Sequence, residues 1–193
     1  MIPASRFVAS KDMDESAWLA ARREGVTATQ VAKAATTAGF AETVQTYWDT
    51  AGIPDNPYMS FGRDAEAWIS LELKKSHDIM PNAWLIKSDN GPYYATPDGL
   101  SLDHTRISEI KTTGKDWAGK IPIAYLRQVQ WQLYVTGADT CVFAWVLRTE
   151  VDGVMVPAWF EPKTLIVERD DDLINTLIEV ADNLYAAVHK GVE

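Results

Sequence analysis

The sequence is poor in the residues that build disulfides and zinc sites. Cys141 is the only cysteine among 193 residues, which excludes an internal disulfide, a multi-cysteine metal site and an iron–sulfur cluster. We expect this cysteine to be buried and inert, in a reducing cytosol. The three histidines are scattered along the chain without the spacing of metal ligands, which argues against a zinc site.

Signals for membranes, nucleotides and serine hydrolases are missing as well. No run of about 18 apolar residues occurs, so we expect no membrane span. The first residues lack a basic segment followed by an apolar stretch, so we expect no signal peptide. The chain has neither a glycine-rich phosphate loop nor a Gly-x-Ser-x-Gly motif, and it has no internal repeat.

Positive charge is scarce, since 18 Lys and Arg stand against 27 Asp and Glu, for a net charge of −9. Such a balance argues against a protein that coats nucleic acid with a general basic surface. It is compatible with a local basic path, and an acidic exterior would discourage binding outside that path. Charge alone therefore leaves the class of partner open.

What is present is the apolar content of a globular domain. Hydrophobic residues make up 47% of the chain, with eight Trp, seven Tyr and five Phe, which suits one well-cored domain of this length. Periodicity and capping residues predict helices over residues 14–24, 27–35, 41–51, 61–75, 123–136 and 170–189. Apolar β-rich runs predict strands over residues 79–87, 93–96, 107–111, 140–147 and 165–168, with a hairpin turn at 151–154.

The middle of the chain places two carboxylates and a lysine on a predicted hairpin. Asp98 ends the first β segment, and Gly99 relaxes the backbone just past it. Side chains alternate between the faces of the second segment, so Glu109 and Lys111 point the same way while Ile110 packs into a core. We expect the three polar groups to converge in one cleft, as a site for a hard divalent cation with a water beside it.

This arrangement, Pro-Asp, ten intervening residues and then Glu-x-Lys, resembles the PD-(D/E)xK nuclease signature. Asp, Glu and Lys are common on protein surfaces. The pattern alone is therefore equally consistent with solvated charges on a hairpin. The rest of the chain has to decide between the two interpretations.

Glu66 shares a predicted helix face with apolar residues. On the helix over 61–75 it lies on the same side as Gly62 and Ile69. A glutamate on a core-facing stripe is costly unless it is paired or ligates something. Two interpretations stay open: Glu66 contributes to the hairpin site, or it lies at the edge of the stripe, where it extends into solvent or pairs with Arg63.

Two segments have the chemistry to contact phosphate. Arg22 and Arg23 precede a helix that Thr27 is expected to cap, and such a helix start can seat an anion. On the residues alone, an ordinary cap with two solvated arginines is favoured. The polar loop over 112–120 carries two lysines, Lys115 among them, and would usually be solvated, but beside a metal cleft it could touch a phosphate backbone.

Three glutamines, Gln128, Gln130 and Gln132, are unusual in so apolar a helix as the one over 123–136. A glutamine that faces a cleft can position a catalytic water or a lysine. The alternative is an exposed helix former, and that is what we expect of Gln130.

Together these pieces resemble the lambda exonuclease / YqaJ-type family of phage recombination nucleases. The features occur in the family's order and cover most of the chain, from about Trp18 to the last helix. They are Trp18-x-x-x-Arg22 with Gly25-Val26-Thr27-Ala28-Thr29, Gly62-x-x-x-Glu66, Thr96-Pro97-Asp98-Gly99-Leu100, Glu109-Ile110-Lys111, and Ala124 to Gln130 leading to Tyr134-Val135-Thr136. Val167-Glu168-Arg169-Asp170, before the final helix, also resembles the family. Each feature is weak by itself, whereas the ordered set is specific.

The resemblance implies an α/β fold with a restriction-endonuclease-like core, in which a central mixed β-sheet is flanked by helices. We expect a single domain over residues 1–193. Within it, we expect a helical N-terminal part over about 14–76 and a catalytic core over about 60–190.

The resemblance also implies roles at the metal. By position, Asp98 and Glu109 would be the central metal ligands, with the Ile110 carbonyl as a third. Glu66 would bind the metals directly or through water. Lys111 would polarise or deprotonate the attacking water.

Further roles follow from the same resemblance. Gln128 would help to hold that lysine and water. Arg22 matches the family's 5′-phosphate-binding arginine, and Thr29 stands where the family has a serine, keeping the hydroxyl but adding a methyl. Lys115 belongs to a segment that resembles a basic-Asp-aromatic segment, in which the family has arginine.

The activity implied is 5′→3′ digestion of one strand of linear double-stranded DNA, leaving 3′ single-stranded overhangs for recombination. Mg²⁺ or Mn²⁺ would be the cofactor. The implied partners are DNA ends with a 5′ phosphate, further copies in a homotrimer and a single-strand annealing protein. The implied location is the cytoplasm of a bacterial host, if the chain is phage-encoded. The alternatives are another PD-(D/E)xK endonuclease or repair nuclease, and a DNA-end-binding protein that has lost cleavage.

Overall fold

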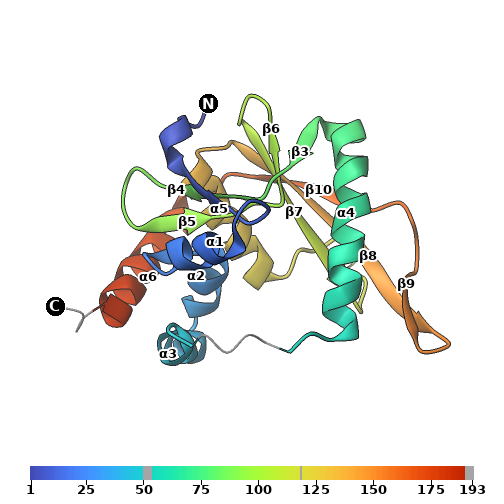
Figure 1. Cartoon of the computed structure of the whole chain (residues 1–193), viewed down its shortest axis with the longest axis horizontal. Coiled ribbons are helices and arrows are strands. Elements are labelled where there is room, and N and C mark those ends of the chain that lie inside the picture. Colours follow the sequence, from blue (N-terminus) through green and yellow to red (C-terminus); the bar gives the residue numbers. More distant parts are fainter. Residues whose placement is uncertain (50–53, 118, 190–193) are drawn as a thin grey trace.

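Two β-sheets and the helices around them make up the fold (Figure 1). The structure is a computed structural model that describes residues 1–49, 54–117 and 119–189. The larger sheet has the order β10-β8-β7-β6-β3, with β9 paired to β8. Its strands are β3 (Ile79–Pro81), β6 (Gly99–Ser101), β7 (Arg106–Thr113), β8 (Thr140–Val151), β9 (Val154–Pro157) and β10 (Lys163–Glu168).

The smaller sheet joins the N-terminal part of the chain to the core. Its order is β1-β4-β5-β2, formed by Phe7–Ser10, Trp84–Lys87, Tyr93–Ala95 and Val26–Thr27 respectively. β1 pairs with β4 and β2 with β5. Two segments near the N-terminus thus complete a sheet with strands from the middle of the chain, and β2 lies within the part over about 14–76 that we expected to be helical.

The helices are η1 (Ala4–Arg6, 3-10), α1 (Glu15–Arg22), α2 (Ala28–Ala34), α3 (Thr37–Thr46), α4 (Pro57–His77), α5 (Ile123–Thr136) and α6 (Asp171–His189). No helix in the described part of the chain is long and apolar enough to cross a membrane. In Figure 1, α4 lies on one side of the larger sheet and α2, α3 and α6 on the other.

β8 shows how the two faces of the larger sheet are covered. Cys141, Phe143 and Trp145 belong to a cluster that includes residues of α2, α5 and α6. The residues between them, Val142 and Ala144, pack with α4 instead. Each face of the sheet thus buries every second residue, which confirms the predicted α/β architecture with helices on both sides.

The parallel neighbour β7 follows the same alternation, with Glu109 paired to Phe143 in the register. Ile107 packs on the side of α5, whereas Ile110 packs against α4 as predicted. Glu109 is two residues from Ile107, so it faces α5. Side-chain alternation in β7 therefore decides which helix meets the central carboxylate.

Several helix limits match the sequence prediction because their caps are local. Asp14 caps α1 by accepting a hydrogen bond from the Ala17 N–H at 2.9 Å. α5 ends at Gly137, whose φ of +76° favours glycine. Asp170 accepts from the Leu173 N–H at 3.0 Å at the start of α6, which agrees with a capping role for this acidic run.

Two helices begin earlier than predicted. α3 starts at Thr37, because Thr36 accepts a hydrogen bond from the Gly39 N–H at 3.1 Å; the predicted end of this helix lies outside the described residues. α4 starts at Pro57 rather than at residue 61, because the Asn56 side chain caps it by accepting from the Tyr58 and Met59 N–H groups, each at 3.0 Å. Pro57 at the first helical position suits this start.

The strand predicted over 79–87 is wrong as a single element. It divides into β3 and β4, which belong to different sheets. Pro81 lacks an N–H, and the Asn82 side chain donates to the carbonyls of Trp84 at 3.1 Å and Pro97 at 2.8 Å. These contacts turn the chain out of one sheet and into the other.

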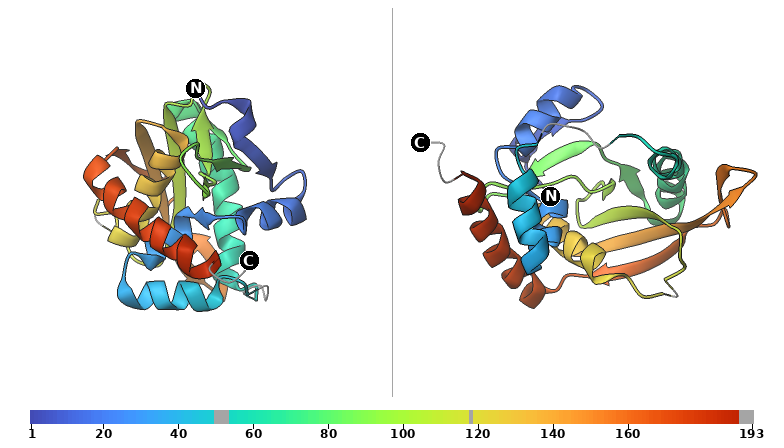
Figure 2. Two further views of the ribbon diagram at one scale, coloured as in Figure 1. Left: turned by 90° about the vertical axis from the view of Figure 1, so that its left-hand side faces the viewer. Right: turned by 90° about the horizontal axis from the view of Figure 1, so that it is seen from below.

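The hairpin predicted at 151–154 is confirmed. Asp152 and Gly153 have φ values of +51° and +80°, as an Asp-Gly hairpin turn requires. In the right-hand view of Figure 2 the β8–β9 hairpin extends away from the body of the protein.

Candidate active site

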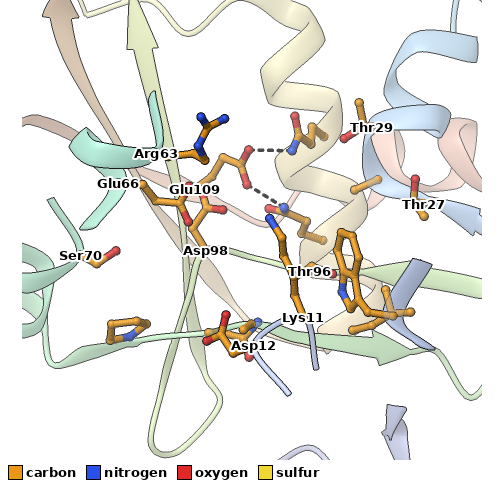
Figure 3. Close-up of a pocket in the computed structure, with 18 of the residues that line it drawn as sticks. Lys11, Asp12, Thr27, Thr29, Arg63, Glu66, Ser70, Thr96, Asp98 and Glu109 are labelled. Atoms are coloured by element: carbon orange, nitrogen blue, oxygen red, sulfur yellow. Dashed lines mark hydrogen bonds between the residues drawn. The ribbon is translucent and has the colours of Figure 1, made fainter. Parts of the chain in front are cut away.

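A cavity of about 530 Å³ lies between α4, α5, the N-terminal segments and the β6–β7 hairpin (Figure 3). Every side chain that the sequence predicted for the site lines this cavity except Lys115. The lining members are Arg22, Thr29, Glu66, Asp98, Glu109, Lys111 and Gln128. A second hollow of about 400 Å³ adjoins it and shares Lys11, Arg63, Glu66 and Lys111.

Asp98 is held by the strand that follows it. Its backbone N–H donates to the Ser108 carbonyl at 3.0 Å, and its Oδ2 accepts from the Ile110 N–H at 2.6 Å. Gly99 serves close packing rather than a special φ, because an added Cβ would lie 2.4 Å from Ser108 Oγ and 2.5 Å from Ile79 Cγ2. The bend therefore aims Asp98 towards β7, as predicted.

Glu109 is the most buried carboxylate of the cavity, with the residue 1% exposed. Gln128 donates from Nε2 to Oε1 at 2.6 Å, and Gln132 donates from Nε2 to Oε2 at 2.7 Å. The two glutamines are four residues apart on α5 and therefore share one face. Figure 3 shows both hydrogen bonds converging on Glu109.

Lys111 lies on the same face of β7 as Glu109 and forms an ion pair with Oε1 of Glu109. Its Nζ also lies 5.2 Å from the centroid of the Tyr125 ring. Burial works to lower the pKa of Lys111, but the negative charges of Glu109 and Asp98 outweigh it and raise the pKa above its ordinary value. In the metal-free protein Lys111 is thus an ammonium group.

The pKa values of the other two acidic groups, Asp98 and Glu66, are raised as well, but for a carboxyl this shift favours the neutral form. Burial, followed by the charge of Glu109, raises the pKa of Asp98 well above its ordinary value. Burial also raises the pKa of Glu66, helped by the charge of Glu109 and opposed by Lys11. Crowded carboxylates in a recessed site disfavour their own charged forms, so the site is electrostatically incomplete without added positive charge.

Glu66 occupies the open side of the cavity rather than the apolar stripe of α4. The residue as a whole is exposed, although the surrounding cavity partly desolvates its carboxyl group, whereas Ile69 packs in the core beneath it. The alternative that Glu66 pairs with Arg63 is not what the structure shows, because Arg63 forms a bidentate pair with Asp55 at 2.6 and 3.0 Å. Glu66 therefore faces the cavity that holds Asp98.

Arg22 and Thr29 line the same cavity. The Arg22 guanidinium stacks over the Trp18 ring, with 4.3 Å from Cζ to the centroid, and burial lowers the pKa of Arg22. Thr27 starts α2, as predicted, and its N–H donates to Gln30 Oε1 at 2.9 Å. A stacked cation, a hydroxyl and a helix start together provide the groups that bind a phosphate.

Lys115 lies apart from these residues. It is exposed on the loop after β7 and lines neither hollow. Thr113 Oγ1 donates to the Lys115 carbonyl at 2.7 Å, which fixes the backbone of the loop but not the amine. Its role as a phosphate contact stays a prediction.

One basic lining residue, Lys11, escaped the sequence analysis. Lys11 enters from the loop after β1 and lines both hollows; no motif marks it, because only β1–β4 pairing brings it there. The sequence analysis left open whether Gln132 faces a cleft, and in the structure it lines the cavity. Gln130, expected to be exposed, is 1% exposed, and it donates to the Glu168 carbonyl and accepts from the Asp170 N–H, each at 2.8 Å.

The donor set suits a hard cation with an incomplete protein shell. In the described ranges, no group of three or more His, Cys, Asp or Glu side chains is assembled to hold a metal. Asp98 and Glu109 supply carboxylate oxygens, and their mutual repulsion is the kind that a cation relieves. Mg²⁺ characteristically binds one or two carboxylates plus substrate phosphate and water. The residues therefore fit such an ion, with Glu66 at the rim.

The fold and the site define an α/β protein with a restriction-endonuclease-like core. The LHK-Exo alkaline exonuclease of Laribacter hongkongensis superposes with a TM-score of 0.71 at 25% identity, covering 92% of this chain and 94% of that one. LHK-Exo in complex with dAMP gives a TM-score of 0.73 at the same identity and coverage. A phage-related exonuclease from Haemophilus somnus 129PT shares the fold, with a TM-score of 0.66 at 12% identity over 87% of this chain and 95% of that one.

The sequence assigns the chain to a particular family within this fold. Residues 17–139 match the model of the YqaJ-like viral recombinase domain, and the chain belongs to this family. The match spans the segments that supply Arg22, Glu66, Asp98, Glu109 and Gln128. No curated protein matches the chain.

Proposed function

We propose that this protein is a recombination exonuclease that requires Mg²⁺ or Mn²⁺, degrades one strand of linear double-stranded DNA in the 5′→3′ direction and leaves 3′ overhangs. The observation that carries the proposal is the shared cavity: Asp98, Glu109 and Lys111 line the same space as Arg22 and Thr29. Membership of the YqaJ-like family and the likeness to LHK-Exo support the exonuclease class.

The carboxylates have a defined part in this proposal. Asp98 and Glu109 would hold the cation, with the Ile110 carbonyl as a third oxygen and Glu66 as a direct or water-mediated ligand at the rim. A bound Mg²⁺ or Mn²⁺ supplies positive charge to the scissile phosphate and acidifies the attacking water. Gln128 and Gln132 hold the Glu109 carboxylate by hydrogen bonds from α5, so the orientation of the carboxylate does not depend on substrate.

Lys111 acts on the water and the phosphate. As an ammonium beside Glu109 it adds positive charge where negative charge develops on the phosphate oxygens. To accept a proton from the water it must first be neutral. That requires the charges of Glu109 and Asp98, which raise its pKa, to be offset. Gln128, which shares Oε1 of Glu109 with Lys111, helps to fix the position of the amine.

The proposed polarity of digestion is supported by Arg22 and Thr29, which line the same cavity as the carboxylates. A 5′-terminal phosphate bound by Arg22 and Thr29 places the first phosphodiester of that strand towards Asp98 and Glu109. A 3′ end lacks the terminal phosphate that this seat would recognise. The seat thus favours entry of 5′ ends and successive release of 5′ mononucleotides.

The partners are proposed on the family resemblance. They are double-stranded DNA ends with a 5′ phosphate, two further copies of the chain in a homotrimer, and a single-strand annealing protein. Lys115, exposed on its loop, is available to contact the DNA backbone outside the cavity.

Linear duplex labelled at the 5′ or the 3′ end, incubated with and without Mg²⁺, tests the proposal directly. We expect early release of the 5′ label as mononucleotide, retention of the 3′ label, and no reaction in EDTA. Supercoiled circular DNA serves as the control and should remain closed. Nicking of circles would identify an endonuclease instead, and end binding without any cleavage would identify the protein as a catalytically silent end-binding protein.

A further inference from the structure

Gln132 is placed to act on the site without meeting the substrate. It is 1% exposed, yet it lines the cavity on the side of α5. Its Nε2 donates to Oε2 of Glu109 at 2.7 Å. The other oxygen of Glu109 is shared by Gln128 and Lys111. Gln132 is thus the only side-chain donor, among the described residues, that bonds Oε2.

The remaining polar atom of Gln132 has no partner. Its Oε1 is buried, and no hydrogen-bond donor from the part of the chain that the structure describes reaches it. A buried amide oxygen without a donor is costly. Because Oε1 has almost no accessible surface, water in the cavity does not reach it, and the bond from Nε2 to Glu109 is the hydrogen bond that orients this amide among the described residues.

We propose that Gln132 is a positioning residue that fixes the Glu109 carboxylate for metal binding through its hydrogen bond to Oε2. The inference rests on the proposed function, because it takes Glu109 as a metal ligand. Without the donor on Oε2, the carboxylate rotates about its side-chain bonds towards Lys111, its remaining charged partner. The cation then binds a carboxylate that has to be reoriented, and its affinity falls.

Gln130 provides a matched control on the same helix. It is equally buried, at 1% exposure, and both of its amide atoms are bonded. Its partners are the Glu168 carbonyl and the Asp170 N–H, which lie at the junction of β10 and α6 and not in the cavity. Loss of the Gln130 amide therefore removes a buried polar group from α5 without touching Glu109.

The test measures Mn²⁺ binding in the absence of DNA, by titration calorimetry on the full chain. Gln132→Met and Gln130→Met each replace the amide by an apolar side chain of similar length. We expect Gln132→Met to weaken Mn²⁺ binding by about 10- to 100-fold, the usual effect of losing an outer-shell partner. Gln130→Met should bind Mn²⁺ like the unsubstituted protein, although both variants lose thermal stability.

The comparison separates this inference from the proposed function. Unchanged Mn²⁺ affinity in Gln132→Met, or an equal loss in Gln130→Met, overturns the positioning role and leaves the metal site standing. Glu109→Gln tests the site itself: if the unsubstituted protein binds Mn²⁺ no better than Glu109→Gln, the metal site and the positioning role are both rejected.

A second variant covers the case in which Gln132→Met does not fold. Gln132→Asn keeps a polar amide but is shorter by one methylene, so its NH₂ group no longer reaches Oε2 of Glu109. It should also weaken Mn²⁺ binding by about 10-fold or more. Unchanged Mn²⁺ affinity in this variant would equally overturn the inference.

Discussion

Replacing Asp98 by asparagine should abolish cleavage and at the same time stabilise the metal-free protein. The amide oxygen of Asp98→Asn can still accept the Ile110 N–H that Asp98 Oδ2 accepts at 2.6 Å. The local hydrogen bond is therefore retained, while the negative charge beside Glu109 is lost. Burial and the charge of Glu109, which raise the pKa of Asp98, no longer oppose folding.

For the size of the effect we take the range usual for a single stabilising substitution, about 0.5–2 kcal/mol. For a chain of this length, each 1 kcal/mol corresponds to about 2–4 °C in Tm. We therefore expect Asp98→Asn to raise the Tm by a few degrees in EDTA at pH 7.5. Added Mn²⁺ should raise the Tm of the unsubstituted protein and leave that of the variant unchanged, because the cation site is lost.

The pH dependence of the free energy of unfolding tests independently whether Asp98→Asn stabilises the protein. A carboxyl whose pKa is raised by folding binds more protons in the folded state, so the free energy of unfolding falls as the pH rises above the unfolded value of about 3.9. The destabilisation is complete above the raised pKa of Asp98 and absent below about pH 4. The advantage of Asp98→Asn should therefore be present at neutral pH and disappear under acid conditions.

Asp103 supplies a control of opposite sign on the same hairpin. Hydrogen bonds from Ser101 Oγ and from the backbone and hydroxyl of Thr105 lower its pKa to about 2. Its contribution to stability is present above the unfolded pKa and lost as the pH falls towards 2, so Asp103→Asn should destabilise the protein at neutral pH. An Asp98→Asn variant that is no more stable than the unsubstituted protein, or whose gain persists at pH 4, would refute the reasoning.

Three further predictions concern the reaction itself. Lys111→Ala should lower the cleavage rate by about 10²- to 10⁴-fold, the usual contribution of a general base. Binding to DNA ends should be largely retained in a mobility-shift assay. Unchanged cleavage would remove this lysine from the mechanism. Arg22→Ala should erase the preference, measured as kcat/KM, for 5′-phosphorylated over 5′-hydroxyl ends. Arg23 is exposed and lies outside the cavity, so Arg23→Ala should keep this preference. Equal cutting of both kinds of end by the unsubstituted protein would disprove the phosphate seat. Lys11→Ala should reduce the salt dependence of DNA binding by about one unit of slope, and an unaltered slope would show that its amine contacts no phosphate.

The central trio was predictable because its geometry is local. The alternation of side chains along a strand places Glu109 and Lys111 on one face and Ile110 on the other, whatever the rest of the chain does. The Asp98 bend needs only its two flanking strands, and Gly99 permits their close approach. The limits of α5 and α6 were equally local, since Gly137 and Asp170 satisfy the ends of their own helices.

The tertiary structure decided which partners meet this trio. Three glutamines recur at every second position of α5, and a helix buried on most sides does not reveal which of them faces a cleft. Packing of α5 against the Glu109 face of β7 sends Gln128 and Gln132 to the carboxylate and turns Gln130 to the β10–α6 junction. Lys11 likewise reaches the cavity only through the pairing of β1 with β4. Hydrophobic period and caps are short-range properties of a sequence, whereas these contacts depend on how whole elements pack, which no single segment encodes.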